Sequence, residues 1–216
     1  MLLLRRVLLK YLPKLLEGKG KENPATILLP LCGKSNDLKF LYDEGHRVLG
    51  VECADEAIHD FFHLNGIRDE TAMVTATKKT MAKLHSSPDQ KLRIVQNNFL
   101  TLDSNALNGT VDCVWDRGAF GTITEIEQTL YVQTIRRLLA PDFRYLLLVL
   151  EFDQSKSNDP VPMPQPESKI RKYFGDFCEI EKMESKIPTH VDLYQKHMGN
   201  PMEVRECVYF MTPKKE

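Results

Sequence analysis

The stretch from Thr26 to Glu52 reads TILLPLCGKSNDLKFLYDEGHRVLGVE and predicts the centre of an α/β fold. An apolar run to Leu31 is followed by a tight turn around Gly33, a polar helical segment, and a second apolar run that ends on Glu52. This order indicates a strand, a glycine turn, a helix and a second strand that carries a carboxylate at its end. In an open α/β sheet, nucleotide-like ligands bind at that edge.

The rest of the chain continues this alternation of apolar runs and amphipathic segments. Further strands are expected at 92–97, 111–115 and 145–152, and helices at 55–65, 126–139 and 168–174. The helix at 126–139 is expected to bury Leu130, Ile135, Leu138 and Leu139. Only a polar loop separates the apolar runs 178–187 and 204–212, so they are predicted to form an antiparallel hairpin.

Two segments do not fit a regular element. Residues 67–90 lack a clear apolar period and are interpreted as a surface excursion. Residues 153–166 contain four prolines and directly follow a predicted central strand, so they form a loop that is expected to shape a substrate pocket. The sequence thus predicts one Rossmann-like α/β domain over 25–216, with a seven-stranded, mostly parallel sheet and helices on both faces.

Residues 1–24 are predicted to form an amphipathic helix and a turn that precede this domain. The segment is leucine-rich and basic, and a face made by Leu3, Val7, Leu8, Tyr11, Leu12 and Leu15 would cover the sheet. The alternative is a presequence or an interfacial helix, but presequences are usually rich in serine as well. We therefore favour the covering helix and a cytoplasmic protein.

Composition excludes several classes of partner. With 29 basic and 30 acidic residues the net charge is −1, which gives no general attraction to nucleic acid or to an anionic membrane. No apolar stretch approaches the roughly 18 residues needed to span a bilayer. The five cysteines are an odd, widely spaced set, which indicates free thiols in a reducing compartment.

The glycine turn constrains the ligand. A dinucleotide fold of the dehydrogenase kind requires Gly-x-Gly-x-x-Gly to cradle a pyrophosphate, and this turn supplies Gly33 alone. A nicotinamide-dependent dehydrogenase is therefore disfavoured, whereas S-adenosylmethionine has no phosphates. Glu52 follows Gly33 by 19 positions, close to the spacing of roughly 20 at which an acid binds a ribose diol.

Further candidate site residues lie at the ends of the neighbouring strands. Val114-Trp115-Asp116-Arg117-Gly118 places an aromatic residue and two charges at the end of the fourth strand, where Arg117 can bind a carboxylate or orient a substrate. The alternative is an ion pair between Asp116 and Arg117 that fixes a loop. Asn98 and Phe99 end the third strand and could bind and stack on an adenine, although asparagines also form turns.

The sequence offers little for metal or covalent chemistry. His59 and His63 are the one helical i, i+4 pair of histidines, but they lack the glutamate and third ligand of a zinc protease. There is no Gly-x-Ser-x-Gly nucleophile elbow. We therefore assign no metal and no covalent intermediate.

Several motifs carry a resemblance to a known family. PLCGK (30–34), EGHRVLGVE (44–52), VWDRGA (114–119), RYLLLVLEFD (144–153) and YFG (173–175) resemble the thiopurine S-methyltransferase family over roughly residues 25–211. The resemblance implies a cytosolic, usually monomeric, class I S-adenosylmethionine-dependent methyltransferase that acts on the sulfur of small aromatic or heterocyclic thiols.

The resemblance also implies roles for individual residues. Leu31 and Gly33 would line the methionine end of the cofactor, Glu52 the ribose, Asn98 and Phe99 the adenine, and Arg117 the cofactor or substrate end. Thiolate attack on the sulfonium methyl needs positioning more than acid or base groups, and Asp116 could act in proton transfer.

The N-terminus departs from the family pattern. Family members usually carry a tryptophan-containing lid segment upstream of the first amphipathic helix, and here the sequence starts at that helix. The alternative to a thiol methyltransferase is therefore a catalytically weakened or non-catalytic relative that acts as a binding module.

Overall fold

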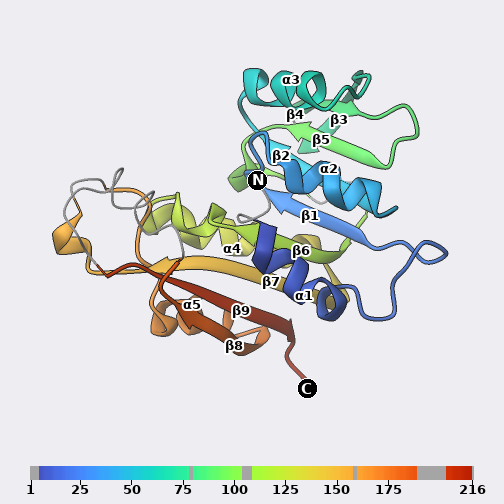
Figure 1. The fold of residues 1–216 in the computed structure, drawn as a ribbon. Coiled ribbons are helices and arrows are strands. Elements are labelled where there is room, and N and C mark those ends of the chain that lie inside the picture. Colours follow the sequence, from blue (N-terminus) through green and yellow to red (C-terminus); the bar gives the residue numbers. More distant parts are fainter. Residues whose placement is uncertain (1–4, 78–79, 104–108, 158–159, 189–202, 216) are drawn as a thin grey trace.

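The chain folds around one mixed β-sheet, seen in a computed structural model that describes residues 5–77, 80–103, 109–157, 160–188 and 203–215. Its nine strands have the spatial order β3-β4-β5-β2-β1-β6-β7-β9-β8 (Figure 1). The strands are β1 (Thr26–Pro30), β2 (Arg47–Glu52), β3 (Glu70–Thr77), β4 (Thr80–Ser86), β5 (Leu92–Gln96), β6 (Val111–Arg117), β7 (Leu139–Glu151), β8 (Cys178–Lys186) and β9 (Arg205–Pro213). The helices are α1 (Arg6–Leu15), α2 (Asn36–Asp43), α3 (Asp55–Leu64), α4 (Glu125–Leu138) and α5 (Glu167–Phe174).

The centre of the sheet is parallel. Strand β1 pairs in parallel with β2 on one side and β6 on the other, while β5 and β7 extend this set outward. The chain therefore winds outward in one direction from β1 to β2 and in the other from β1 to β6. This reversal of strand order is the topological switch point, where α/β proteins bind ligands beyond the carboxyl ends of the strands.

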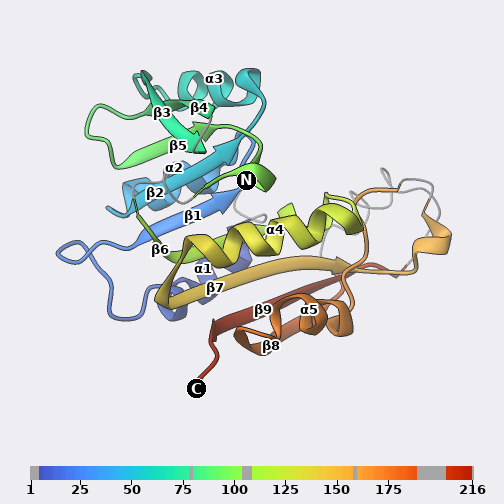
Figure 2. The same ribbon diagram turned by 180° about the vertical axis from the view of Figure 1, so that it is seen from behind.

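Helices cover both faces of the sheet. Helices α1, α2 and α3 lie on the face toward the viewer in Figure 1, where Phe61 and Trp115 belong to the buried cluster. Helices α4 and α5 lie on the opposite face, seen in Figure 2, where Tyr131 and Phe174 belong to a second buried cluster. The expected Rossmann-like α/β fold with a C-terminal antiparallel hairpin, β8 and β9, is confirmed.

The N-terminal helix α1 packs on the sheet as predicted. Val7, Leu8, Tyr11 and Leu15 are buried in the same cluster as residues of β7 and β9. Leu12 is partly buried, and Leu3 lies outside the described residues. The apolar face of this segment is thus used to cover the sheet.

The number of strands differs from the sequence prediction. Residues 67–90, interpreted as a surface excursion, contain β3 and β4, so the sheet has nine strands and not seven. β4 pairs antiparallel with β5, and β3 extends the sheet beyond it. The hairpin contributes the small side chains of Ala76 and Ala82 and the larger one of Leu84 to the core, whereas its apolar residues Met73 and Met81 are exposed. The usual alternation of large buried and polar exposed residues is therefore absent.

A second difference concerns the buried face of α4. Leu130 was expected to be buried but is 44% exposed, whereas Gln128 is fully buried. The Gln128 side-chain Nε2 donates to the carbonyl of Phe120 at 2.9 Å, which satisfies one end of the buried amide.

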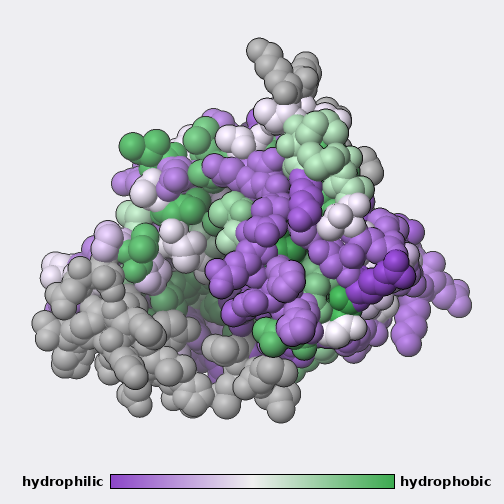
Figure 3. Space-filling view, turned by 90° about the horizontal axis from the view of Figure 1, so that it is seen from above, coloured by the Kyte–Doolittle hydropathy of each residue, from purple (hydrophilic) through white to green (hydrophobic). Residues whose placement is uncertain are grey.

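The molecular surface combines hydrophilic and hydrophobic residues. Figure 3 looks down on the end of the molecule formed by α3, β3 and β4, and hydrophilic residues cover much of this face, with separate hydrophobic patches. In the described parts of the chain, no helix combines the length and hydropathy that crossing a bilayer requires.

Candidate active site

The glycine turn after β1 is tied to the end of β2 through Glu52. One oxygen of the Glu52 carboxylate, Oε2, accepts from the backbone N–H of Gly33 at 2.9 Å. The other, Oε1, accepts from the N–H groups of Cys53 and Ala54, both at 2.8 Å. The carboxylate is half-buried, so it lies at the sheet edge with its position set by the backbone. The structure thus brings together Gly33 and Glu52, as the 19-residue spacing predicted.

The backbone of this turn has an unusual conformation. Leu31 has a φ of 45° and Gly33 a φ of 51°, both in the left-handed region. A side chain in that region costs roughly 1–2 kcal/mol, which Gly33 avoids and Leu31 does not. Backbone strain of this kind persists where the surrounding structure imposes it, and it clusters at functional sites.

The glycine turn is also fitted closely against β2. A Cβ atom at Gly50 would lie 2.7 Å from Cys32 Sγ, so Gly50 makes room for the thiol beneath the turn. Burial raises the pKa of the Cys32 thiol well above its usual range, and the charge of Glu52 adds to this effect. Cys32 is therefore a neutral packing residue and not a nucleophile.

The end of β5 places the two adenine candidates differently. Asn98 is exposed, and its Oδ1 accepts from the N–H of Leu100 at 2.9 Å, which caps the short 3-10 helix η2 (Phe99–Thr101). Phe99 is only 3% exposed and packs on Tyr131 at a centroid separation of 4.9 Å. Asn98 thus stays at the edge, whereas the ring of Phe99 lies in the core below it.

The residues of β6 do not form a single wall, because alternate side chains of a strand point to opposite faces. Trp115 is 1% exposed and points to the α1–α3 face. Asp116 is fully buried on the α4 face, and Arg117 points to the same face as Trp115. The alternative of an ion pair between Asp116 and Arg117 is wrong. Asp116 is bound by two tyrosines on one face of the sheet, whereas Arg117 pairs with Asp37 on the other.

Asp116 is held by two tyrosines. Its Oδ2 accepts from the hydroxyl of Tyr131 at 2.6 Å and from that of Tyr145 at 2.8 Å. Its Oδ1 accepts from the N–H of Phe120 at 3.4 Å. Burial raises the pKa of Asp116 to about 6, and the hydrogen bonds from the tyrosines partly oppose this shift. The carboxylate has no exposed surface, which favours a role in the core.

Asp37 is a residue of this edge that sequence reasoning missed. It lies in the first turn of α2 and is 3% exposed. Its carboxylate accepts from Trp115 Nε1 at 2.9 Å and from Arg5 Nε at 3.0 Å, and Arg117 Nη1 lies at 3.8 Å. An acid at the start of a helix is usually a cap. The signal that could have found it is the lone tryptophan, whose buried N–H needs an acceptor.

The proline-containing loop lies beside the end of β6, as expected. The N–H of Met163 donates to the carbonyl of Gly121 at 2.7 Å, in the 3-10 helix η4 (Ala119–Gly121). The N–H of Gln165 donates to the carbonyl of Leu150 at 2.8 Å, near the end of β7. The loop is therefore attached to the carboxyl edge of the sheet, except for residues 158–159, which are outside the described chain.

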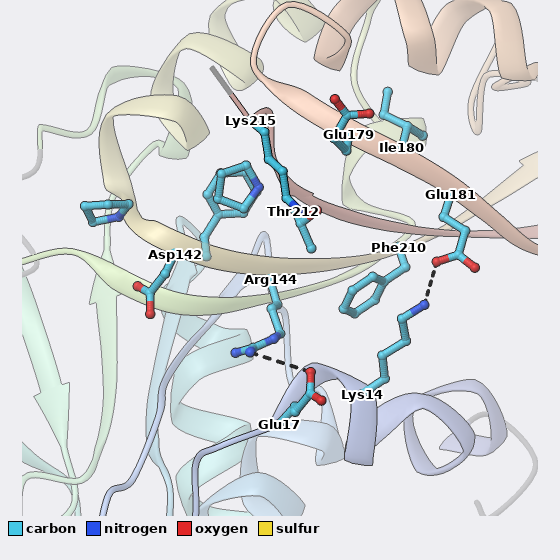
Figure 4. Close-up of a pocket in the computed structure, with 13 residues that line it drawn as sticks. Lys14, Glu17, Asp142, Arg144, Glu179, Ile180, Glu181, Phe210, Thr212 and Lys215 are labelled. Carbon is cyan, nitrogen blue, oxygen red and sulfur yellow. Dashed lines mark hydrogen bonds and ion pairs between the residues drawn. The ribbon is translucent and has the colours of Figure 1, made fainter.

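A surface hollow of about 880 Å³ lies elsewhere (Figure 4). It is lined in part by Arg144, which pairs with Cys113 near the start of β6, so it belongs to the amino edge of the parallel strands. Four of its charged side chains form ion pairs with one another: Lys14 with Glu181 at 2.5 Å and Arg144 with Glu17 at 3.8 Å. The hollow is therefore separate from the candidate site.

Among the residues that the structure describes, no three His, Cys, Asp or Glu side chains are grouped so as to hold a metal ion. His59 and His63 are exposed and their rings stack at 6.1 Å. All five cysteines are free, and four of them are buried, as expected for thiols that sit in apolar runs.

The sheet order and the two helical layers are those of the class I S-adenosylmethionine-dependent methyltransferase fold. The family model for thiopurine S-methyltransferase matches residues 5–214, and the chain belongs to this family. Thiopurine S-methyltransferase of Bos taurus is 30% identical over 211 residues, which cover 97% of this chain and 81% of the bovine protein. The protein of that name from Panthera leo is 29% identical with the same coverage.

Solved structures share the fold at low sequence identity. The 1,6-didemethyltoxoflavin-N1-methyltransferase of Burkholderia thailandensis, solved with S-adenosylhomocysteine, superposes with a TM-score of 0.60 at 16% identity, covering 98% of this chain and 78% of that one. The geranyl diphosphate C-methyltransferase of Streptomyces coelicolor has a TM-score of 0.59 at 11% identity, covering 97% and 76%. These enzymes are named for nitrogen and carbon acceptors, so the fold does not fix the acceptor atom.

Proposed function

We propose that this protein transfers the methyl group of S-adenosylmethionine to the sulfur of a small aromatic or heterocyclic thiol. Membership of the thiopurine S-methyltransferase family supports the acceptor. The observation that carries the proposal is the Glu52 carboxylate, held at the end of β2 by the N–H of Gly33. A fixed carboxylate beside a single glycine turn suits a ribose diol and a cofactor without phosphates.

The roles proposed for the edge residues follow from their positions. Leu31 and Gly33 would contact the methionine part of the cofactor, and Glu52 would accept from the ribose hydroxyls. Asn98 would bind the adenine with its exposed amide. Phe99 would support Asn98 from the core, because its ring is buried against Tyr131.

The reaction needs little from the side chains beyond positioning. The thiolate sulfur forms a bond to the methyl carbon as the bond from that carbon to the sulfonium breaks, and the electron pair remains on the sulfur of S-adenosylhomocysteine. The thiol loses its proton before attack. Asp116 has no exposed surface and is bound by two tyrosines, so we assign the proton to solvent and not to Asp116. Orientation and exclusion of water supply the rate enhancement.

Methyl transfer tests the proposal directly. The protein would be incubated with S-adenosylmethionine bearing a trideuterated methyl group and with thiophenol, and the products followed by mass spectrometry. We expect the labelled methyl thioether together with S-adenosylhomocysteine. Phenol and aniline are matched controls, because they present oxygen or nitrogen on the same ring.

Methylation of phenol or aniline in preference to thiophenol would contradict the assignment of sulfur as acceptor. Cofactor binding without methylation of any thiol would favour a binding module over an enzyme. We further propose that the protein acts as a monomer in the cytoplasm.

A further inference from the structure

We propose that Asp37 is a positioning residue that holds the guanidinium of Arg117 at the carboxyl edge, and that Arg5 makes the start of the N-terminal helix part of the same unit. This inference rests on the proposed function, since it assumes that Arg117 faces a ligand there. It concerns three side chains from α2, β6 and the residue preceding α1, which are far apart in the sequence.

The Asp37 carboxylate is buried but fully engaged. Its side chain is 4% exposed. Oδ1 accepts from Arg5 Nε at 3.0 Å, and Oδ2 accepts from Trp115 Nε1 at 2.9 Å. Arg117 Nη1 lies 3.8 Å from Oδ2, an ion pair without the short contact of a hydrogen bond. Because a buried charge is costly unless it is paired, this carboxylate attracts both guanidinium groups, that of Arg5 on Oδ1 and that of Arg117 on the Oδ2 side.

The location of Asp37 orients the Arg117 side chain toward the other side of the switch point. Arg117 ends β6, whereas Asp37 follows the glycine turn after β1. The ion pair therefore draws the Arg117 head toward the turn that contains Gly33, while its side chain remains 33% exposed. A long, flexible side chain that is held in place loses less entropy when it binds a ligand.

Arg5 completes the arrangement. Its Nη2 donates to the carbonyl of Asn36 at 2.8 Å, and its guanidinium lies over the ring of Phe40 at 4.5 Å. Arg5 is thus fixed at the N-terminal end of α2 by contacts other than the ion pair. It occupies Oδ1, which leaves the Oδ2 side of Asp37 to Trp115 and Arg117.

A double-mutant cycle tests the inference. The dissociation constant of S-adenosylhomocysteine, and kcat and KM for S-adenosylmethionine and thiophenol, would be measured for the full chain and for Asp37→Asn, Arg117→Gln and the double variant. Whichever of these constants Arg117→Gln changes, we expect Asp37→Asn to change the same one in the same direction, each by about three- to tenfold. The double variant is expected to be no worse than Arg117→Gln alone.

Arg5→Gln is a further, milder variant of the same unit. Arg5 is partly exposed, and its loss leaves Asp37 with two partners, Trp115 and Arg117. We expect it to move the same constant by a smaller factor, again without effect when Arg117 is already changed. Asp43→Asn is the matched control, since Asp43 lies at the other end of α2 in an exposed pair with Lys39, and it should change nothing.

Trp115 is the only tryptophan, so its fluorescence reports directly on the contact with Asp37. We expect Asp37→Asn to shift the emission of the folded protein, whereas Asp43→Asn should not. Additive effects of the Asp37 and Arg117 substitutions, or of those at Arg5 and Arg117, would overturn the inference. If wild-type protein does not bind S-adenosylhomocysteine, the proposed function itself is wrong.

Discussion

At the scale of single residues, the buried group formed by Asp116, Tyr131 and Tyr145 combines packing with a titratable charge. Two hydroxyls converge on one carboxylate oxygen in the core between β6, β7 and α4. The N–H of Phe120 donates to the other oxygen, so the carboxylate also secures the turn at Ala119–Gly121 that the proline-containing loop contacts. Removing the charge would thus affect stability in a manner that depends on pH.

We predict that the stabilising contribution of Asp116 decreases as the pH rises. Its pKa is about 6 in the folded protein, because burial disfavours the charge, and about 3.9 in an unfolded chain. The folded state therefore binds the proton more tightly, so this contribution is present below pH ~4 and is lost as the pH rises through ~6. The difference corresponds to about 3 kcal/mol.

Urea unfolding of wild-type protein and Asp116→Asn at pH 4 and pH 7 measures this effect. The free energy of unfolding of wild type minus that of the variant should fall by a few kcal/mol between the two values. Other carboxyl groups titrate in both proteins and cancel in the difference. A difference that does not change with pH would show that Asp116 is not a perturbed acid.

The sequence predicted some residues of the site and not others, for a physical reason. Gly33 and Glu52 belong to one local unit of strand, turn, helix and strand, and their spacing reflects its fixed length. Phe99 and Asp37 depend on partners from distant elements, Tyr131 and Trp115. Which of two neighbouring residues faces the core is decided by such contacts, which no local pattern records.

At the scale of elements, α1 covers the face of the sheet formed by β1, β6, β7 and β9. Leu8 and Leu15 are fully buried there, and the Cys113 thiol donates to the carbonyl of Leu15 at 3.1 Å. Ion pairs from Lys10 to Glu184 and from Lys14 to Glu181 connect the helix to β8. The helix is thus a structural part of the domain.

Neighbouring leucines of α1 provide a matched test. Leu8 is fully buried and Leu9 is 41% exposed. We predict that Leu8→Ala lowers the free energy of unfolding by about 2–5 kcal/mol, because it leaves a cavity in the core, whereas Leu9→Ala changes it by less than about 1 kcal/mol. Chemical denaturation measures both. Equally small effects would mean that α1 is not packed on the sheet in solution.

The β3–β4 hairpin is the part of the sheet that the sequence did not predict. All seven expected strands are present. Large apolar residues run through the buried positions of the central strands, such as β1, β2 and β7. The β3–β4 hairpin was missed since alanines occupy two of its buried positions and methionines are on its exposed face. Pairing with the edge of β5, a long-range contact, is what defines these strands.

At the scale of the whole molecule, the parallel centre of the sheet gathers the ends of β1, β2, β5 and β6 at one edge. The glycine turn, Glu52, Asn98 and Arg117 all lie at or just after the ends of those strands, although they span much of the chain. The hollow at the amino edge, which is lined in part by the ion pairs Lys14–Glu181 and Arg144–Glu17, lies away from this group. The architecture therefore favours a single cofactor site at the carboxyl edge, bounded by the proline-containing loop.

Calorimetric titration with S-adenosylhomocysteine tests this account most directly. We predict that folded wild-type protein binds one molecule, and that Glu52→Gln weakens the affinity about tenfold or more, because a charged acceptor for the ribose hydroxyls is lost. Glu56→Gln, an exposed acid in the first turn of α3, should bind as wild type does. Absence of binding to the folded wild-type protein, or an affinity that Glu52→Gln leaves unchanged, would contradict the assignment of the carboxyl edge as the cofactor site.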